Sequence, residues 1–337
     1  MLASTIRVVV STLVLVASVP TVWSASRTAI VFRHTFRAPS ATLKCTPTLS
    51  SNYSQWNTYS AKPWPDFGTA PQNATVRGLQ LTKEFAKYLP RKLNQVTAGT
   101  MVELIYDEND RDRETAQALK EGLQEAGLKQ VTMSSNASLF DVSKTGVCSS
   151  MDADNRTAAL QEQFSVVPVP SNYESLMSAM QKILGSGSAP PLSDSMFNDF
   201  YYSGYWEGRT CLAASFAESF LFEYGSKILV GWGGVELNTN STASNALFRL
   251  LENHVYYRSV NMKAPAVARH DRSNLVNAIL RVLDGGDGSS SQSPLSDILT
   301  IFVGHDADVD QVSTMFNTTF QVHSIVYLHS ACCCSGC

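Results

Sequence analysis

A short apolar run that ends in two arginines and a histidine constrains this chain more than any other feature. Residues 28–32 have the composition of a buried β-strand, and Arg33, His34 and Arg37 follow at once. A guanidinium is costly to bury without an anionic partner, so packing does not explain two of them at the end of a core strand. Arginine binds phosphate through two parallel hydrogen bonds, and a histidine between two arginines is placed to attack phosphorus. The sequence therefore predicts a phosphate site at the end of this strand.

Periodic patterns along the first half of the chain predict alternating helices and strands. A long loop over 38–72, rich in Ser, Thr, Pro and aromatic residues, precedes them. We predict helices over 74–89 and 115–127, and strands over 101–106 and 130–133. Strands that alternate with helices are typical of a parallel sheet covered by helices on both faces.

The middle of the chain, residues 149–258, has a different pattern, which we interpret as a mainly helical insertion. Its helix-like segments are separated by loops. We predict helices over 158–164, 173–184, 212–224 and 243–258. A helix over 271–284 and a low-complexity spacer over 285–293 then lead to a last buried strand over 298–303.

Polar residues follow three of the predicted strands. The first strand runs into Arg33 and His34, the second into the charged stretch 107–115, and the last into His305 and Asp306. The carboxyl ends of parallel strands open at one edge of the sheet, where α/β folds bind ligands. We therefore expect the three polar segments to form one site.

These segments resemble the histidine acid phosphatases. The match rests on the Arg-His-x-x-Arg-x-Pro motif at 33–39, on the acidic stretch that ends in Thr115, and on the His-Asp pair at 305–306. The His-Asp pair resembles that of the acid phosphatase and periplasmic phytase branch, as do the segments 144–148 and 231–233. The resemblance covers about residues 28–320.

The resemblance implies a fold and a division into domains. The fold is a three-layer α/β/α sandwich with a mixed, mainly parallel sheet, plus a helical insertion. The implied segments are an α/β phosphatase domain over 25–148 and 259–322, a helical cap over 149–258, and an atypical Cys-rich tail over 323–337.

The resemblance also implies roles for named residues in a two-step hydrolysis that uses no metal and no cofactor. His34 would be the nucleophile and Asp306 the general acid. The residues implied to bind phosphate are Arg33, Arg37, Arg111 and His305. The residues implied to contact substrate are Ser40, Glu218, and either Arg269 or Arg272, which the alignment does not separate.

Local alternatives accompany three of these assignments. Spacing to Thr115 favours Arg111 over Arg113 as the third arginine of the clamp. The alternative interpretation of Ser40 is an ordinary loop serine, and that of Glu218 is an exposed carboxylate on a helix. A strongly positive clamp favours the ionised form of Asp306, so an acid role for it predicts an acidic optimum.

Four departures from the family pattern stand out. Thr35 replaces a glycine after the nucleophile, and a β-branched residue restricts the backbone at that turn. Asp112 stands where threonine is common, and Asp308 stands where asparagine is usual. After Gln321 the pattern stops, although family members continue with another strand, so the sheet is expected to lack a partner strand.

The N-terminus predicts export. Arg7 precedes an apolar stretch over 8–22, and Val22 and Ser24 occupy the positions that a signal peptidase reads, so residues 1–24 are interpreted as a signal peptide. The alternative, an uncleaved anchor, is disfavoured because the stretch is short and no stop-transfer pattern follows. We therefore expect a secreted or lumenal protein in an extracellular, lysosome-like or vacuolar compartment.

Composition limits the partners. A formal net charge of −3 does not suggest a nucleic-acid partner, which would favour a basic face. Six sequons predict N-linked glycans, at Asn52, Asn73, Asn136, Asn155, Asn240 and Asn317. The seven cysteines are an odd number, four of them crowd the last six residues, and their pairing does not follow from the sequence.

Three functions compete on these grounds. The first is a secreted phosphomonoesterase acting on phytate, sugar phosphates or similar small molecules. The second is a catalytically impaired relative that binds phosphate or inositol phosphates. The third is a phosphotransferase of the phosphoglycerate mutase type, which the predicted signal peptide and the His-Asp pair disfavour.

Overall fold

The chain divides into two compact units. The computed structural model describes residues 6–7, 14–20, 26–43, 45, 56–63, 65–93, 96–145, 150–194, 199–228, 241–284 and 298–318. Unit 1 comprises Met1–Thr35, Leu79–Ser150 and Ala268–Cys337. Unit 2 comprises Phe36–Gly78 and Met151–Val267.

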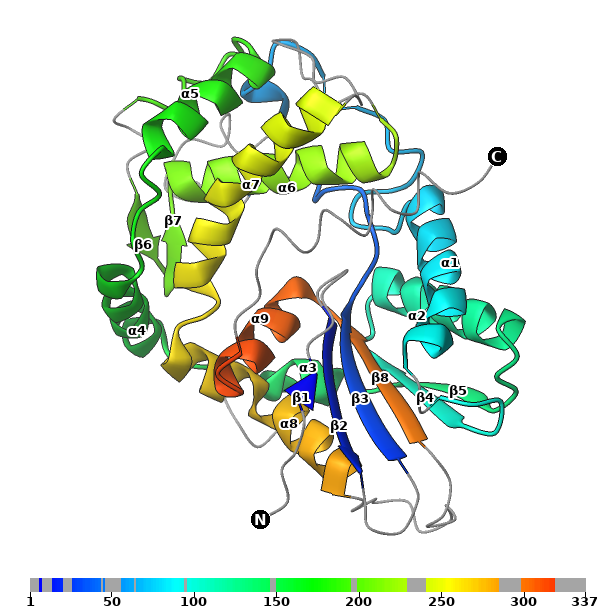
Figure 1. Cartoon of the computed structure of the whole chain (residues 1–337). Helices are drawn as coiled ribbons and strands as arrows, with labels where there is room; N and C mark the ends of the chain where they lie inside the picture. The colour runs from blue at the N-terminus through cyan, green and yellow to red at the C-terminus, as the bar shows by residue number, and fades with distance from the viewer. Residues whose placement is uncertain are drawn as a thin grey trace. The chain divides into compact units, whose positions relative to one another are not determined.

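Unit 1 is built on a mixed sheet with the strand order β1-β2-β3-β8-β4-β5 (Figure 1). The strands are β1 (Ile6–Arg7), β2 (Val14–Pro20), β3 (Ser26–Arg33), β4 (Met101–Tyr106), β5 (Val131–Ser135) and β8 (Ile298–Gly304). The pairs β3–β8, β8–β4 and β4–β5 are parallel, whereas β1–β2 and β2–β3 are antiparallel. The predicted mainly parallel sheet is confirmed.

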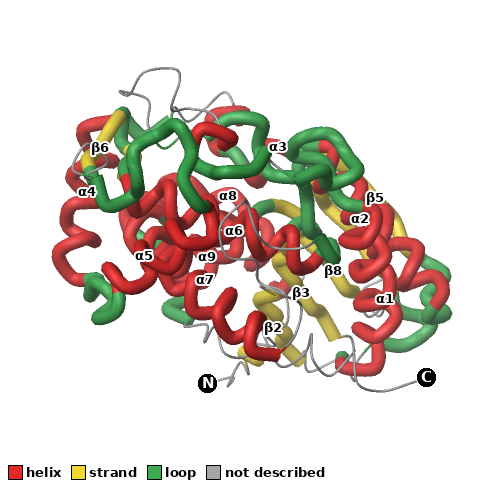
Figure 2. The backbone as a smooth tube through the Cα atoms, turned by 90° about the horizontal axis from the view of Figure 1, so that it is seen from above, coloured by secondary structure: helices red, strands yellow, loops and turns green. Residues whose placement is uncertain are grey.

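The two faces of this sheet bury alternate side chains of the same strands. In β3, Ile30 and Phe32 belong to one apolar cluster, and Ala29 and Val31 belong to another. The first cluster includes residues of α1 (Val76–Lys92) and α2 (Asp110–Glu125). The second includes residues of α3 (Ala137–Phe140), α8 (Pro265–Asp284) and α9 (Asp306–Met315). The period of two along a strand therefore produces the three layers that Figures 1 and 2 show.

Two parts of unit 1 differ from the sequence predictions. Helix α2 begins at Asp110 rather than at Thr115, so the charged stretch forms its first turn. The backbone of Val14–Pro20, predicted to belong to a signal peptide, pairs with β3 over seven positions. Cleavage after Ser24 would remove this strand, and the predicted cleavage stays a prediction.

Unit 2 is mainly helical, like the predicted insertion. Its helices are α4 (Ala153–Val166), α5 (Tyr173–Leu184), α6 (Arg209–Gly225) and α7 (Ser241–Asn261), accompanied by the 3-10 turn η2 (Trp56–Thr58) and the hairpin β6 (Phe200–Tyr202) and β7 (Tyr205–Glu207). A further 3-10 turn, η3 (Val142–Thr145), follows α3 in unit 1.

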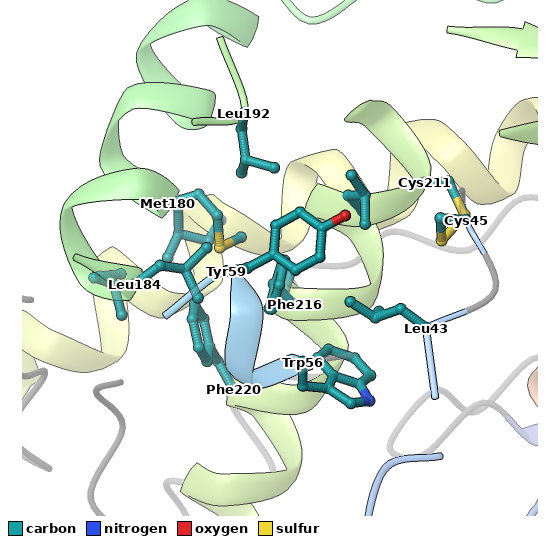
Figure 3. Packing of buried hydrophobic residues seen from close by; sticks show 14 of the residues in the cluster. Leu43, Cys45, Trp56, Tyr59, Met180, Leu184, Leu192, Cys211, Phe216 and Phe220 are labelled. Atoms are coloured by element: carbon teal, nitrogen blue, oxygen red, sulfur yellow. A yellow bond between two sulfur atoms is a disulfide. The ribbon is translucent and has the colours of Figure 1, made fainter. Parts of the chain in front are cut away.

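The loop after β3 belongs to unit 2 because its apolar residues pack against the helices of that unit. Trp56 and Tyr59 lie with their ring centroids 5.2 and 5.7 Å from that of Phe216 (Figure 3). A disulfide between Cys45 and Cys211 adds a covalent link. Residues 36–78, predicted as part of the α/β domain, therefore cluster with 151–267.

Several predicted features lie outside the described residues. These are Cys148, the segment 231–233, the spacer 285–293 and the Cys-rich tail 323–337. None of the described helices has both the length and the apolar character needed to cross a membrane.

The buried carboxyl of Glu207, at the end of β7, generates a stability prediction. Burial raises the pKa of Glu207 to about 7, and its Oε2 accepts no hydrogen bond from the described residues. The folded state therefore holds this proton more tightly than the unfolded chain, so stability falls as pH rises from about 4.5 to about 7.

We predict that Glu207→Gln, which stays neutral, abolishes this part of the pH dependence. At about pH 8 the variant should be more stable than the wild type by up to about 3 kcal/mol, and at about pH 4 nearly equal to it. Denaturant unfolding at both pH values measures the difference. Parallel pH profiles for the two proteins would contradict the assignment.

Candidate functional site

The carboxyl ends of three adjacent strands meet at one edge of the unit 1 sheet. The register pairs Arg33 of β3 with Gly304 of β8, and Tyr106 of β4 with Val303 of β8. The first residues after these strands are therefore neighbours. His34 donates its backbone N–H to the Gly304 carbonyl at 2.8 Å, and the Asp107 N–H reaches the Val303 carbonyl at 3.1 Å.

His34 is held in one tautomer by its own backbone. The ring is 4% exposed, and Nδ1 lies 2.9 Å from the carbonyl oxygen of Thr35. A carbonyl oxygen only accepts, so Nδ1 carries the proton and, in the neutral ring, Nε2 keeps its lone pair. His34 thus has the form that a nucleophile needs.

Thr35, the residue that replaces the family's glycine, fits the turn. Its φ is not among the positive values of the described non-glycine residues, so a β-branched side chain is compatible with this backbone. Its N–H donates to Thr115 Oγ1 at 3.1 Å, and the Thr115 hydroxyl donates to the carbonyl of Arg111 at 2.7 Å. Thr115 therefore connects the His34 loop to the first turn of α2.

His305 is clamped by carboxylates. Its Nε2 lies 3.0 Å from Asp107 Oδ2, and Asn109 Nδ2 donates to the same oxygen at 2.8 Å. Burial lowers the pKa of His305, but the hydrogen bond to Asp107 and the charges of Asp112 and Asp308 outweigh it, so the net pKa lies above 6.5. His305 is therefore cationic under mildly acidic conditions.

Asp306 and the two candidate arginines of α2 are placed differently. Asp306, the first residue of α9, has Oδ2 3.9 Å from Arg33 Nε. Arg111 places a guanidinium nitrogen 3.4 Å from His305 Nδ1, whereas Arg113 pairs with Asp110 at 2.8 Å on the exposed face of α2. Of the two arginines, Arg111 is the one the structure brings to His305.

Asp308 anchors the turn into α9. Its side chain is fully buried, Oδ2 accepts the His305 backbone N–H at 2.5 Å, and Oδ1 forms an ion pair with Arg272 Nε. A Cβ on Gly304 would meet this carboxylate, so Asp308 lies against the end of β8. Arg272 is thus paired with Asp308, whereas Arg269 is exposed to solvent.

The remaining predicted residues lie in unit 2. Arg37 contacts Glu218 at 3.4 Å, and its guanidinium carbon lies 4.9 Å above the centre of the Phe222 ring. The Ser40 carbonyl accepts the indole N–H of Trp56 at 2.7 Å. Two of the predicted ligand-binding residues, Arg37 and Glu218, therefore contact each other within this unit.

Each unit contains a group of three side chains of the types that bind metal ions. In unit 1, Asp107 Oδ2 lies 3.0 Å from His305 Nε2 and Asp112 Oδ1 lies 3.7 Å from His305 Nδ1, so the two carboxylates face different nitrogens of the ring. In the other group Glu207 lies beside Cys45 and Cys211, but those sulfurs are bonded to each other and are not thiolate ligands.

Comparison with solved structures identifies the fold. The phytase of Hafnia alvei in its apo form has a TM-score of 0.71 and 22% identity, over 90% of this chain and 77% of the phytase. The phytase of Klebsiella sp. ASR1 has a TM-score of 0.69 and 19% identity, over 90% and 75% of the two chains. That of Citrobacter braakii has a TM-score of 0.68 and 21% identity, over 88% and 76%.

At these identities the likeness establishes the fold. The chain has the α/β fold of these bacterial phytases, with a helical part, and the predicted fold class is confirmed. No protein-family model matches the sequence. No curated protein matches it at a significant level.

Sequence reasoning missed the roles of Asp107 and Thr115. Asp107 directly follows the strand predicted over 101–106, and His34 and His305 stand second after the strands predicted over 28–32 and 298–303, so its place at a predicted strand end was the available signal. Thr115 carried no comparable signal, because its bond to Thr35 joins residues 80 apart in sequence.

We predict that Thr115→Val destabilises the protein. The valine is close in shape but leaves the buried Thr35 N–H without its acceptor, which costs about 1–3 kcal/mol. Denaturant unfolding measures the loss, and Thr115→Ser, which keeps the hydroxyl, is the matched control. A loss below about 0.5 kcal/mol for the valine variant would show that the bond is dispensable.

Proposed function

We propose that this protein is a phosphomonoesterase that works through a phosphohistidine on His34. The observation that carries the proposal is the Nδ1–Thr35 hydrogen bond, which puts the proton of the neutral His34 ring on Nδ1 and the lone pair on Nε2. The His34 ring lies 5.6 Å from that of the cationic His305, centroid to centroid. A nucleophile beside fixed positive charge suits an attack on an anionic phosphoryl group.

In the first step, His34 Nε2 attacks phosphorus and the N–P bond forms as the P–O bond to the alcohol breaks. Asp306 in its protonated form gives its proton to the leaving alkoxide. In the second step, the Asp306 carboxylate takes a proton from water, the water oxygen bonds to phosphorus, and the N–P bond breaks. Inorganic phosphate leaves, and Asp306 has regained its proton.

The proposed phosphate ligands of unit 1 are arranged so that a bound anion would stabilise them. A guanidinium nitrogen of Arg111 lies 3.4 Å from His305 Nδ1. When His305 is protonated, both nitrogens carry N–H groups, and the two positive charges repel each other. A phosphate oxygen placed against both would accept from both and relieve that repulsion. Arg33, paired with Asp306 at 3.9 Å, would bind a further oxygen.

The proposed substrate is a small phosphate ester carrying several anionic groups. The Hafnia alvei phytase was solved in complexes with tartrate and with myo-inositol hexakis sulphate, and both are polyanions. Arg37, and Arg269 on the exposed face of α8, would supply positive charge for the outer groups, and Ser40 and Glu218 would contact hydroxyls. We propose a secreted or lumenal setting, in keeping with the predicted signal peptide.

A catalytically impaired binding protein is the alternative. It keeps the same cationic groups but lacks turnover, so the experiment below separates the two. The test is hydrolysis of p-nitrophenyl phosphate and of glycerol 2-phosphate at about pH 5, compared through kcat/KM, which reports the steps up to departure of the alcohol.

We predict that Asp306→Asn lowers kcat/KM for glycerol 2-phosphate by about 10²–10⁴, because its alkoxide must be protonated as it leaves. The loss for p-nitrophenyl phosphate should be far smaller, since nitrophenolate leaves without a proton. His34→Ala should abolish turnover of both esters. The control is His270→Ala, which should retain turnover, because the His270 ring pairs with Asp271 elsewhere on unit 1.

If Asp306→Asn lowered kcat/KM equally for the two esters, Asp306 would not be the general acid. Tight binding of inorganic phosphate by a wild-type protein that hydrolyses neither ester would favour the impaired relative.

A further inference from the structure

Asp112 is a fully buried carboxylate beside the proposed phosphate site. Both of its carboxylate oxygens lack a hydrogen-bond donor among the described residues, and Oδ1 lies 3.7 Å from His305 Nδ1. A buried acid without donors needs an explanation, because the ionised form is poorly solvated there.

The charges around Asp112 are mixed. His305 and Arg111 favour its ionised form, whereas Asp107 and Asp308 oppose it. Burial is the largest influence and, with the two neighbouring carboxylates, raises the pKa of Asp112 to about 7. Asp112 therefore changes charge near neutral pH.

Ionised Asp112 competes with phosphate for one particular proton. His305 Nε2 is engaged by Asp107, so Nδ1–H is the ring donor left for a ligand. Arg111 lies 3.4 Å from that nitrogen and Asp112 lies 3.7 Å from it. An anionic Asp112 would attract Nδ1–H and repel a phosphate oxygen, whereas a neutral Asp112 does neither.

We propose that Asp112 is a positioning residue that couples anion binding to its own protonation. When Asp112 is neutral, the His305 Nδ1–H can donate to an oxyanion. When Asp112 is ionised, its carboxylate attracts that N–H and the oxyanion loses the donor. Binding of an oxyanion at this site therefore takes up a proton at Asp112. The inference rests on the proposed function insofar as the oxyanion is the phosphate of a substrate.

The test is calorimetric titration of the full chain with myo-inositol hexakis sulphate. Its sulphate groups do not titrate near neutrality, unlike phosphate, so any proton taken up on binding comes to the protein. Titrations in two buffers of different ionisation enthalpy, from about pH 5 to about pH 8.5, give both the affinity and the number of protons taken up.

For the wild type we expect Kd to rise about tenfold between about pH 6 and about pH 8, with proton uptake approaching one per site near pH 8. Asp112→Asn keeps the shape of the neutral acid and should show less than about a twofold change in Kd from this cause, with about one proton fewer taken up. Asp112→Thr, with a smaller neutral side chain, is a second variant and should follow Asp112→Asn.

Three results would overturn the inference. They are binding by the wild type without proton uptake, the same pH profile in wild type and variants, and no binding at any pH. Each is independent of turnover: a wild type without phosphatase activity can still show Asp112-dependent uptake, and an active enzyme can lack it. Failure of the proposed function and failure of this inference are therefore distinguishable.

Discussion

Strand β8 lies between β3 and β4 and pairs in parallel with both, and the placement of the charged groups at the sheet edge depends on this pairing. The register brings the residues that follow the three strands to the same edge. His34 and His305 each lie one residue past the Arg33–Gly304 pair, and Asp107 lies one residue past the Tyr106–Val303 pair. A slip of one residue in β8 would turn Ile301 and Val303 to the opposite face and separate His305 from Asp107, so the core and the site fix the same register.

The charges at this edge are held in pairs rather than as a uniform positive patch. Asp107 holds His305, Asp308 holds Arg272, and Asp306 lies near Arg33. In surroundings of low polarity such pairs keep each side chain oriented, and removing one partner leaves a buried charge. Asp112 differs from the other acids, because it is buried without a hydrogen-bond donor among the described residues and its charge state follows the pH near neutrality.

The parts of the fold and site that could be predicted from the sequence are those that depend on periodicity and strand ends. The strands β3, β4 and β8 and the positions of His34 and His305 follow from apolar runs that stop at polar residues. The Thr115–Thr35 bond, the Arg272–Asp308 pair and the Cys45–Cys211 disulfide could not be predicted. Each joins segments far apart in the chain, and only the packed structure shows which side chains meet.

The phosphohistidine mechanism is tested most directly by identifying the residue that becomes phosphorylated. Rapid acid-free quenching of the wild type with a ³²P-labelled monoester, followed by peptide mapping, should yield a phosphoryl label that is stable to alkali and labile to acid. The label should map to the peptide containing His34 and be absent from His34→Ala. Turnover of the ester with no label on His34, or with the label on another residue, would contradict a phosphohistidine mechanism at this site.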